Sequence, residues 1–375
     1  MARDTVIVLH NGSPYGGWKS VESTHSFEEA AGEAKLVISE QPGNPLPMKL
    51  GDDVVIIYGS TPVITGYVKG IDGSNDWGSH DINITVMDNT RFMIDSKLGP
   101  GVNHQSPISP KKLVEDTLSK MGLSKIGVVD KIGAPDFGPG EQITGAIDEG
   151  GHEFLDKWLN KRQLVMHPDG KGNVVLDRNQ QRTGPGTLYR GREDSPQNNV
   201  LRSSYQITDE GRHNSANAAA QHSPNDKPYW EDRPKGDPPA QSGPLSTKWG
   251  EAIDEDVRPE RKLYYRAERG LNDDSPKKAA VWRSNVARAR GYSYAATVQG
   301  FEAAPGELWW PGVVIPVYDY AWEISELLFI KSVTFRKDWG GGSITEISCT
   351  YKDGYSNQEG GAPKSRTGSH GTGSP

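Results

Sequence analysis

The chain is poor in cysteine, since Cys349 is the only one among its 375 residues. A single thiol excludes a disulfide framework within one chain and any zinc site built from cysteines. Its place in a strand-like stretch predicts a small, buried apolar residue. No apolar run approaches the roughly 20 residues that a membrane-spanning helix needs. The first apolar stretch, residues 5–9, is too short for a signal peptide. We therefore expect synthesis and folding in the cytoplasm, with no membrane segment.

The common motifs of enzymes are missing as well. There is no glycine-rich phosphate loop, no His-Glu-x-x-His and no Gly-x-Ser-x-Gly. His152-Glu153 stands alone, and the adjacent acids Asp52-Asp53 and Asp273-Asp274 precede a strand and a helix. The nine histidines do not cluster at the spacing of metal ligands: His10, His25, His80, His104, His152, His167, His213, His222 and His370. We expect no catalytic, cofactor-binding or metal-binding residue and no enzymatic activity.

Glycine and proline are plentiful, at 44 and 26 residues, whereas charged residues make up 24% and hydrophobic residues 34%. This composition is typical of a turn-rich soluble protein with short strands, and the length allows two to four domains. The net charge of −7 is uneven, because residues 1–97 hold 7 basic and 13 acidic residues, a net of −6. That acidity argues against nucleic-acid binding there, since phosphate contacts need clustered Lys and Arg.

Residues 1–97 are predicted to form an all-β unit, because apolar and polar residues alternate in short, evenly spaced runs. In one of these runs, Val21, Ser23, His25 and Phe27 share a face. The predicted strands are 5–9, 18–27, 34–40, 54–58, 63–71 and 81–87. The Gly- and Asn-containing stretch 73–78 predicts a hairpin loop between two of them.

Residues 98–185 are predicted to form a separate mixed unit of helices and a hairpin. Ser109-Pro110 begins a helix that Gly122 ends, and a second helix covers 150–162. A short strand is expected at 126–129. A hairpin is expected over 164–177, around a Gly-containing turn.

Residues 186–352 are predicted to form a second β unit, entered through a Gly/Pro-rich joint at 182–191. Strand 201–208 opens it, and 216–222 is expected to pair with that strand. The stretch 223–259 then breaks the pattern with a Pro-rich insertion that has no periodicity. Trp230 and Trp249 in this insertion favour a docked loop that makes contacts outside its own unit. A strand is expected again at 264–269.

A basic helix is predicted at 276–290, with Ser275 as N-cap and Pro276 in the first turn. The apolar face comprises Ala279, Trp282, Val286 and Ala289, and the rest carries Lys277, Lys278, Arg283, Arg288 and Arg290. We interpret the basic residues as a solvated face or a contact to an acidic subunit; a nucleic-acid patch is the alternative, although interleaved aromatics are missing. Strand-like runs follow to residue 351, so a helix laid on a meandering sheet is expected to form a closed unit.

Two sets of short motifs carry a family resemblance. In the second β unit, Gly306-Glu307-Leu308-Trp309-Trp310-Pro311 precedes the Val-rich run 313–317. In the first, the matching runs are 51–56, 65–68, 82–86 and 93–95, with Met87-Asp88-Asn89 where family members usually have Gly-Arg-Asp. These stretches, together with the order of the units, resemble the baseplate hub proteins of contractile-tailed bacteriophages, in the late-control protein D family to which the hub of phage Mu belongs.

The resemblance implies a fold that is mainly β with α+β parts. Two barrels like those of tail-tube subunits, 1–97 and 186–352, would flank the small α/β domain 98–185, with an extended tail at 353–375. It also implies a homotrimeric ring in the virion baseplate, assembled in the host cytoplasm, that adapts the six-fold tail tube to the three-fold spike. Its partners would be the trimeric tail spike, the tail tube or a distal tube protein, and other baseplate proteins. The alternatives are a tail-associated protein that degrades the cell wall, which would need a carboxylate or Ser/His site, and one that binds its carbohydrate through exposed Trp77, Trp230 or Trp249.

Such a ring would surround a channel for genomic DNA, which passes without specific binding. An acidic or neutral wall suits that passage, because DNA carries about one negative charge per 1.7 Å of its axis. The candidate inward-facing acids are Glu22, Glu28, Glu29, Glu33, Asp72 and Asp81. The Gly/Ser-rich tail from residue 354 is expected to be anchored by the spike or another baseplate protein.

Overall fold

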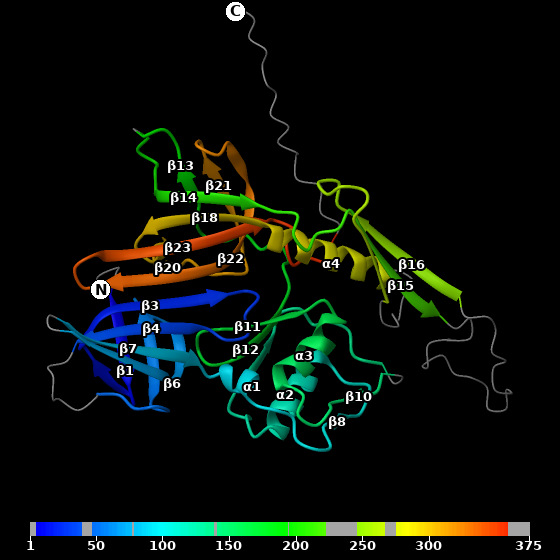
Figure 1. Ribbon diagram of the computed structural model, residues 1–375, viewed down its shortest axis with the longest axis horizontal. Coiled ribbons are helices and arrows are strands. Elements are labelled where there is room, and N and C mark those ends of the chain that lie inside the picture. The colour runs from blue at the N-terminus through cyan, green and yellow to red at the C-terminus, as the bar shows by residue number, and fades with distance from the viewer. Residues whose placement is uncertain are drawn as a thin grey trace, which may run out of the picture. The chain divides into compact units, whose positions relative to one another are not determined.

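The structure is a computed structural model that describes residues 5–39, 47–76, 79–138, 141–193, 195–222, 246–266 and 275–358 (Figure 1). It is mainly β, as the sequence predicts. The chain divides into two compact units, of which the first comprises Met1–Gln206 and Ser293–Lys352. The second comprises Ile207–Tyr292 and Asp353–Pro375. The division into two barrels, a middle domain and a tail stays a prediction.

The first unit is built on one large sheet with the strand order β14-β18-β23-β22-β3-β4-β7-β6-β5-β1-β2, to which β21 and β13 add beside β22. The early strands are β1 (Val6–His10), β2 (Ser13–Tyr15), β3 (Trp18–Ser26), β4 (Glu33–Ser39), β5 (Asp53–Tyr58), β6 (Thr61–Asp76) and β7 (Ser79–Asp88). The late strands are β13 (Leu188–Arg190), β14 (Val200–Ile207), β18 (Tyr292–Gln299), β21 (Val314–Asp319), β22 (Ile324–Asp338) and β23 (Gly342–Tyr351). A small hairpin, β19 (Glu302–Ala304) and β20 (Glu307–Leu308), lies between β18 and β21 in the chain.

The large sheet contains an internal repeat. In the strand order given above, the first half is laid out as β3, β4, β7 and β6, which are its first, second, fourth and third strands in the chain. The strands β14, β18, β22 and β23 of the second half lie in the same order. The two halves meet where β3 pairs antiparallel with β22. The correspondence extends to the next strand, because β5 pairs with the first part of β6 as β21 pairs with the first part of β22.

Matching irregularities support this repeat. A register shift lies between Val68 and Gly70 of β6, and another lies between Ile330 and Ser332 of β22. Each leaves one extra lysine, Lys69 or Lys331, at the bulge. Because bulges are placed by the local geometry of a strand pair, their equivalent positions indicate that both halves follow one plan.

One face of the sheet packs into the core of the first unit. Alternate residues of β3, β4 and β7 are buried, as period-two strands require. Beneath the junction of the halves, the rings of Tyr58, Phe301 and Phe335 contact one another at centroid distances of 4.7 to 5.9 Å. The Tyr58 hydroxyl donates a hydrogen bond to Ser23 Oγ. The two halves therefore share a core as well as a sheet.

The segment between the halves contains three helices and short strands, in the order α1 (Arg91–Asp95), β8 (Asn103–His104), α2 (Pro110–Lys120), β9 (Val128–Asp130), β10 (Ile143–Thr144), α3 (Gly151–Asn160), β11 (Val165–Pro168) and β12 (Val174–Asp177). Ser109 caps α2 by accepting a hydrogen bond from the Lys112 amide, and Gly122 takes a positive φ after it. Both helices predicted here are confirmed. Phe154, Leu155, Trp158 and Leu159 form the buried face of α3.

The second unit has a three-stranded sheet in the order β16-β15-β17, with α4 (Ser275–Gly291) packed on it. Its strands are β15 (Ser215–His222), β16 (Ser246–Ile253) and β17 (Lys262–Arg266). Helix and sheet approach very closely at Gly250, where a Cβ atom would lie 2.2 Å from the Lys277 nitrogen. Ala218 and Ala280 are fully buried at this contact.

Several details differ from the sequence predictions. Residues 73–76 continue β6, so they are not part of a hairpin loop. The joint at 182–191 contains β13, which pairs parallel with β21. Strand 215–222 pairs with β16 and β17 and not with β14.

Two further differences concern the insertion and the helix. Residues 246–253 of the predicted irregular insertion form β16, in which Trp249 is 61% exposed. Helix α4 packs on β15 and β16, whereas it was expected to close on the meander that follows it. Trp77, Trp230, Asp273-Asp274 and the tail from residue 359 lie outside the described residues.

Candidate functional site

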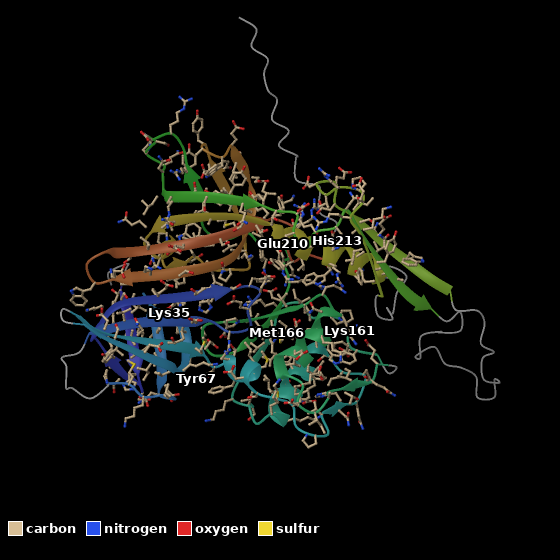
Figure 2. The ribbon with its side chains drawn as sticks, in the orientation of Figure 1. Lys35, Tyr67, Lys161, Met166, Glu210 and His213 are labelled. Carbon is tan, nitrogen blue, oxygen red and sulfur yellow. The ribbon has the colours of Figure 1, made fainter. Side chains whose placement is uncertain are left out.

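The face of the large sheet that points away from the core is mostly polar across both halves, with Val37, Met87 and Ile344 among its apolar members. In β3, Val21, Ser23 and His25 are buried, so Glu22 and Thr24 lie on the opposite face. Residues directly opposite in neighbouring strands share that face, and the pairings identify them. They include Ser20, Glu22, Thr24, Glu33, Lys35, Asp72, Asp81, Asn83, Thr85, Ser332, Thr334, Arg336, Asp338, Glu346 and Ser348. We call this set the polar face; Figure 2 labels Lys35 on β4.

Ion pairs cross the polar face between strands. Arg336 donates from Nε to Glu22 Oε2 at 2.9 Å, which joins β22 to β3 and thus one half to the other. This bond raises the pKa of the Arg336 guanidinium. Thr24 and Thr334 exchange a hydroxyl hydrogen bond of 3.0 Å beside it. Because these groups are only partly buried, the pairs fix the alignment of the halves more than they stabilise the fold.

Acidic side chains outnumber basic ones on the polar face. The acids are Glu22, Glu33, Asp72, Asp81, Asp338 and Glu346, against Lys35, Arg336 and the neighbouring Arg202 and Lys19. Lys19 pairs with Asp81 at 2.6 Å, and Arg202 lies 3.8 Å from Glu346. The face is therefore rich in small hydroxyl and amide groups and carries a weak excess of negative charge.

The structure brings together most of the acids that the sequence marked as candidates. Glu22, Glu33, Asp72 and Asp81 share the polar face. Glu28 and Glu29 lie in the connection between β3 and β4, off the regular strands. Glu28 is 3.9 Å from Lys331.

None of the other acids and histidines that the sequence singled out forms a catalytic pair or a metal centre in the described part of the chain. Asp52 accepts from His10 Nε2 at 2.8 Å, and this bond together with the Lys49 amide lowers the pKa of its carboxyl group. Asp53 is exposed at the start of β5. His104 is buried against Thr117, and burial lowers its pKa to about 4. No group of three His, Cys, Asp or Glu side chains is arranged for a metal within the described ranges.

Two titratable residues of the first unit, His25 and Asp88, are buried in the core. No pattern in the sequence indicated that ionisable groups would be buried there. Burial lowers the pKa of His25 to about 4, although its Nε2 bonds the Val63 carbonyl oxygen at 2.5 Å. Burial raises the pKa of Asp88 to about 6, against the hydrogen bonds that it accepts from the Thr90 amide and hydroxyl. Cys349 is buried in β23, as predicted, and burial raises the pKa of its thiol.

The basic helix is less solvated than its sequence suggested. Arg288 is buried, with Nε 3.5 Å from Asp254 Oδ1. Asp254 also receives two hydrogen bonds, of 3.0 and 2.9 Å, from the fully buried Arg212. One basic residue of α4 is thus part of an internal charge cluster of the second unit. Arg283 remains exposed and stacks over the Tyr265 ring at 4.6 Å.

Comparison with known proteins shows what the large sheet is similar to. Residues 5–88 match the family model of the Mu phage baseplate assembly protein GpP-like, N-terminal domain. This match covers the first half of the repeat, including β3, β4, β6 and β7. The resemblance to phage baseplate hub proteins that the motifs predicted is confirmed.

Individual relatives cover almost the whole chain. The chain is 23% identical to the baseplate hub protein gp44 of Escherichia phage Mu over 362 residues, which are 94% of this chain and 89% of that protein. The 43 kDa tail protein of prophage MuSo2 from Shewanella oneidensis has the same fold, with a TM-score of 0.72, 21% identity and coverage of 94% and 99%. A tail protein from Neisseria meningitidis MC58 gives a TM-score of 0.75, 18% identity and coverage of 94% and 98%.

No helix among the described residues is both long and apolar enough to cross a membrane.

Proposed function

We propose that the chain is a structural, non-enzymatic hub of a phage tail baseplate. Three copies form a ring that joins the six-fold tail tube to the three-fold spike and surrounds the channel for genomic DNA. The similarity to the baseplate hub protein of phage Mu supports the baseplate role. Other baseplate proteins would contact the outside of the ring.

The observation that carries this proposal is the internal repeat of the large sheet. Each half contributes four strands in the same spatial order. Three chains with two equivalent halves would present six similar sheets around one axis, while the chains themselves obey three-fold symmetry. A closed ring of identical subunits is the usual outcome when such head-to-tail contacts repeat by rotation. The repeat thus offers a physical solution to the mismatch between the tube and the spike.

The polar face suits the inner wall of that ring. It spans both halves, with Val37, Met87 and Ile344 among its few apolar members, and its acids exceed its bases, so it would repel DNA weakly and offer few phosphate contacts. A face that packs against a protein core is expected to be apolar instead. The other face of the sheet packs in this way.

The test of the channel role changes the charge of the polar face. Glu33→Lys combined with Asp338→Lys should slow DNA ejection from assembled particles, because each added lysine holds the passing phosphates. Glu255→Lys, at an exposed site in the second unit, serves as the matched control and should leave ejection unchanged. Normal ejection kinetics from fully assembled double-variant particles would show that the polar face does not line the DNA path.

A further inference from the structure

The turn between β22 and β23 presents a tryptophan to solvent. Trp339 directly follows β22 and is 77% exposed, the largest exposed fraction of any large apolar side chain among the described residues. Its backbone is nevertheless fixed, because its amide donates a hydrogen bond of 2.8 Å to the Lys19 carbonyl oxygen. Its ring meets that of Trp18 edge to face at a centroid distance of 6.4 Å. We call residues 339–341 the tryptophan turn.

The first half of the sheet carries the same three residues at the matching place in the sequence. Asp338-Trp339-Gly340 stands where β22 ends, and Asp76-Trp77-Gly78 stands where β6 ends. Each aspartate comes seven residues after the lysine of its bulge, Lys331 or Lys69. The structure describes β6 up to its aspartate, so the match of the tryptophan and glycine is one of sequence. An identical tripeptide at the same distance from the same irregularity indicates one purpose for both turns.

Both turns lie at the same end of the large sheet. The strands β22, β3, β4, β7 and β6 are joined in this order by four successive antiparallel pairings. β22 and β6 therefore run in the same direction, and each leads into its turn at the same end of the strands. In a ring of three chains, six such turns would stand on one rim, apart from the polar face that lines the channel.

The charges around the tryptophan turn indicate what surface would complement it. Asp338 lies opposite Ser20 on the polar face, directly beside the indole. The nearby amines are occupied, since Lys337 donates to Ser343 Oγ at 2.8 Å and Lys19 pairs with Asp81 at 2.6 Å. The turn thus presents an apolar ring next to an anion. A complementary surface offers an apolar pocket with a cation at its rim.

We propose, on the basis of the ring described above, that Trp339 docks in such a pocket on the neighbouring ring of six identical protein subunits, and that Trp77 docks in the next pocket of the same ring. Two like turns in each of three chains give six like turns, which match six identical pockets. A three-fold neighbour would meet the two turns of one chain in different surroundings and would give no reason for the same tripeptide in both. The tryptophans are the anchors of this contact, as buried aromatic residues commonly are at protein interfaces.

Alanine variants in assembling phage particles test the docking. Trp339→Ala and Trp77→Ala are made separately, and the baseplates that carry a tail tube are counted by electron microscopy. Each variant should lower the yield of tube-bearing baseplates by roughly tenfold or more, because truncating an aromatic anchor commonly costs at least that factor in affinity. Trp339→Phe keeps an apolar ring and should retain most of the yield. Trp249→Ala is the matched control, since Trp249 is 61% exposed in the second unit, and should leave the yield unchanged.

Mass spectrometry of the same baseplates measures the copy number of the hub. Normal tube attachment by baseplates with three copies of the Trp339→Ala chain would overturn the docking and leave the proposed ring standing. A loss of tubes in only one of the two alanine variants would contradict the six-fold match. Baseplates that lack the variant hub altogether would also contradict the proposal, because the turns would then act in an earlier assembly step. A wild-type copy number other than a multiple of three would count against the ring itself.

Discussion

Two buried side chains of the first unit, His25 and Asp88, are expected to respond to pH in opposite directions. The pKa of His25 falls to about 4 in the fold, so the native state must exclude a proton that the unfolded chain binds below pH 6.5. The pKa of Asp88 rises to about 6, so the native state holds a proton that the unfolded chain releases above pH 3.8. Their contributions therefore oppose each other between pH 4 and 6.

Asp88→Asn should stabilise the protein at neutral pH. The neutral amide keeps an oxygen for the Thr90 amide and hydroxyl, and it removes a buried charge. From the size of the pKa shift, the free energy of unfolding should rise by up to about 3 kcal/mol at pH 7.5. The gain should shrink as pH falls through 6 and vanish near pH 4, where the wild-type carboxyl is protonated in both states. Urea unfolding at both pH values measures it.

His25→Gln provides the companion measurement with the opposite sign. In the wild-type protein, the stability that His25 removes as pH falls from 6.5 toward 4 is largely offset between pH 6 and 4 by Asp88, which keeps a native-state proton there. The glutamine variant keeps only the Asp88 contribution, so its stability should rise as pH falls from 6 toward 4. An equal pH dependence in wild type and variant would mean that His25 is not the group responsible.

At the scale of elements, the contact of β16 with α4 depends on the absence of a side chain at Gly250. A Cβ atom there would lie 2.2 to 2.5 Å from backbone atoms of Pro276 and Lys277, so strand and helix would have to separate. This explains why the strand carried no hydrophobic period in the sequence: its helix-facing positions are Gly250 and Ala252, and the apolar Trp249 and Ile253 are exposed.

Gly250→Ala is expected to destabilise the second unit by about 1–3 kcal/mol, the usual cost of overpacking. Hydrogen exchange of the α4 amides should become faster, while exchange of β3 and β22 should remain unchanged. Gly73→Ala is the matched control, since nothing lies within 4 Å of a Cβ atom at that strand position. Unchanged protection of α4 in Gly250→Ala would show that helix and strand separate without cost.

Local patterns in the sequence predict most of the elements but few of their partners. The alternation of Val21, Ser23 and His25 and the cap at Ser109 follow from the chain nearby, and both are confirmed. The pairing of Glu22 with Arg336 joins residues 314 positions apart, and no local period encodes it. Arg288 was expected on a solvated face or in contact with an acidic subunit, because its buried partner Asp254 directly follows β16, a strand that the pattern did not reveal.

At the scale of the whole molecule, the same order of four strands occurs twice within the large sheet. It would occur six times around the channel of the proposed ring. The sequence alone predicted some acids of the polar face. That the face extends across both halves follows only from the β3–β22 pairing in the structure. The equivalence of the halves would let three subunits meet a six-fold neighbour with closely similar surfaces.

The most direct test of this account is an electron cryo-microscopy reconstruction of the assembled baseplate. The account predicts three copies of the chain around the axis, with Glu22, Lys35 and Arg336 directed toward the channel. A ring of six copies would contradict it. So would three copies whose polar faces point outward, away from the DNA path.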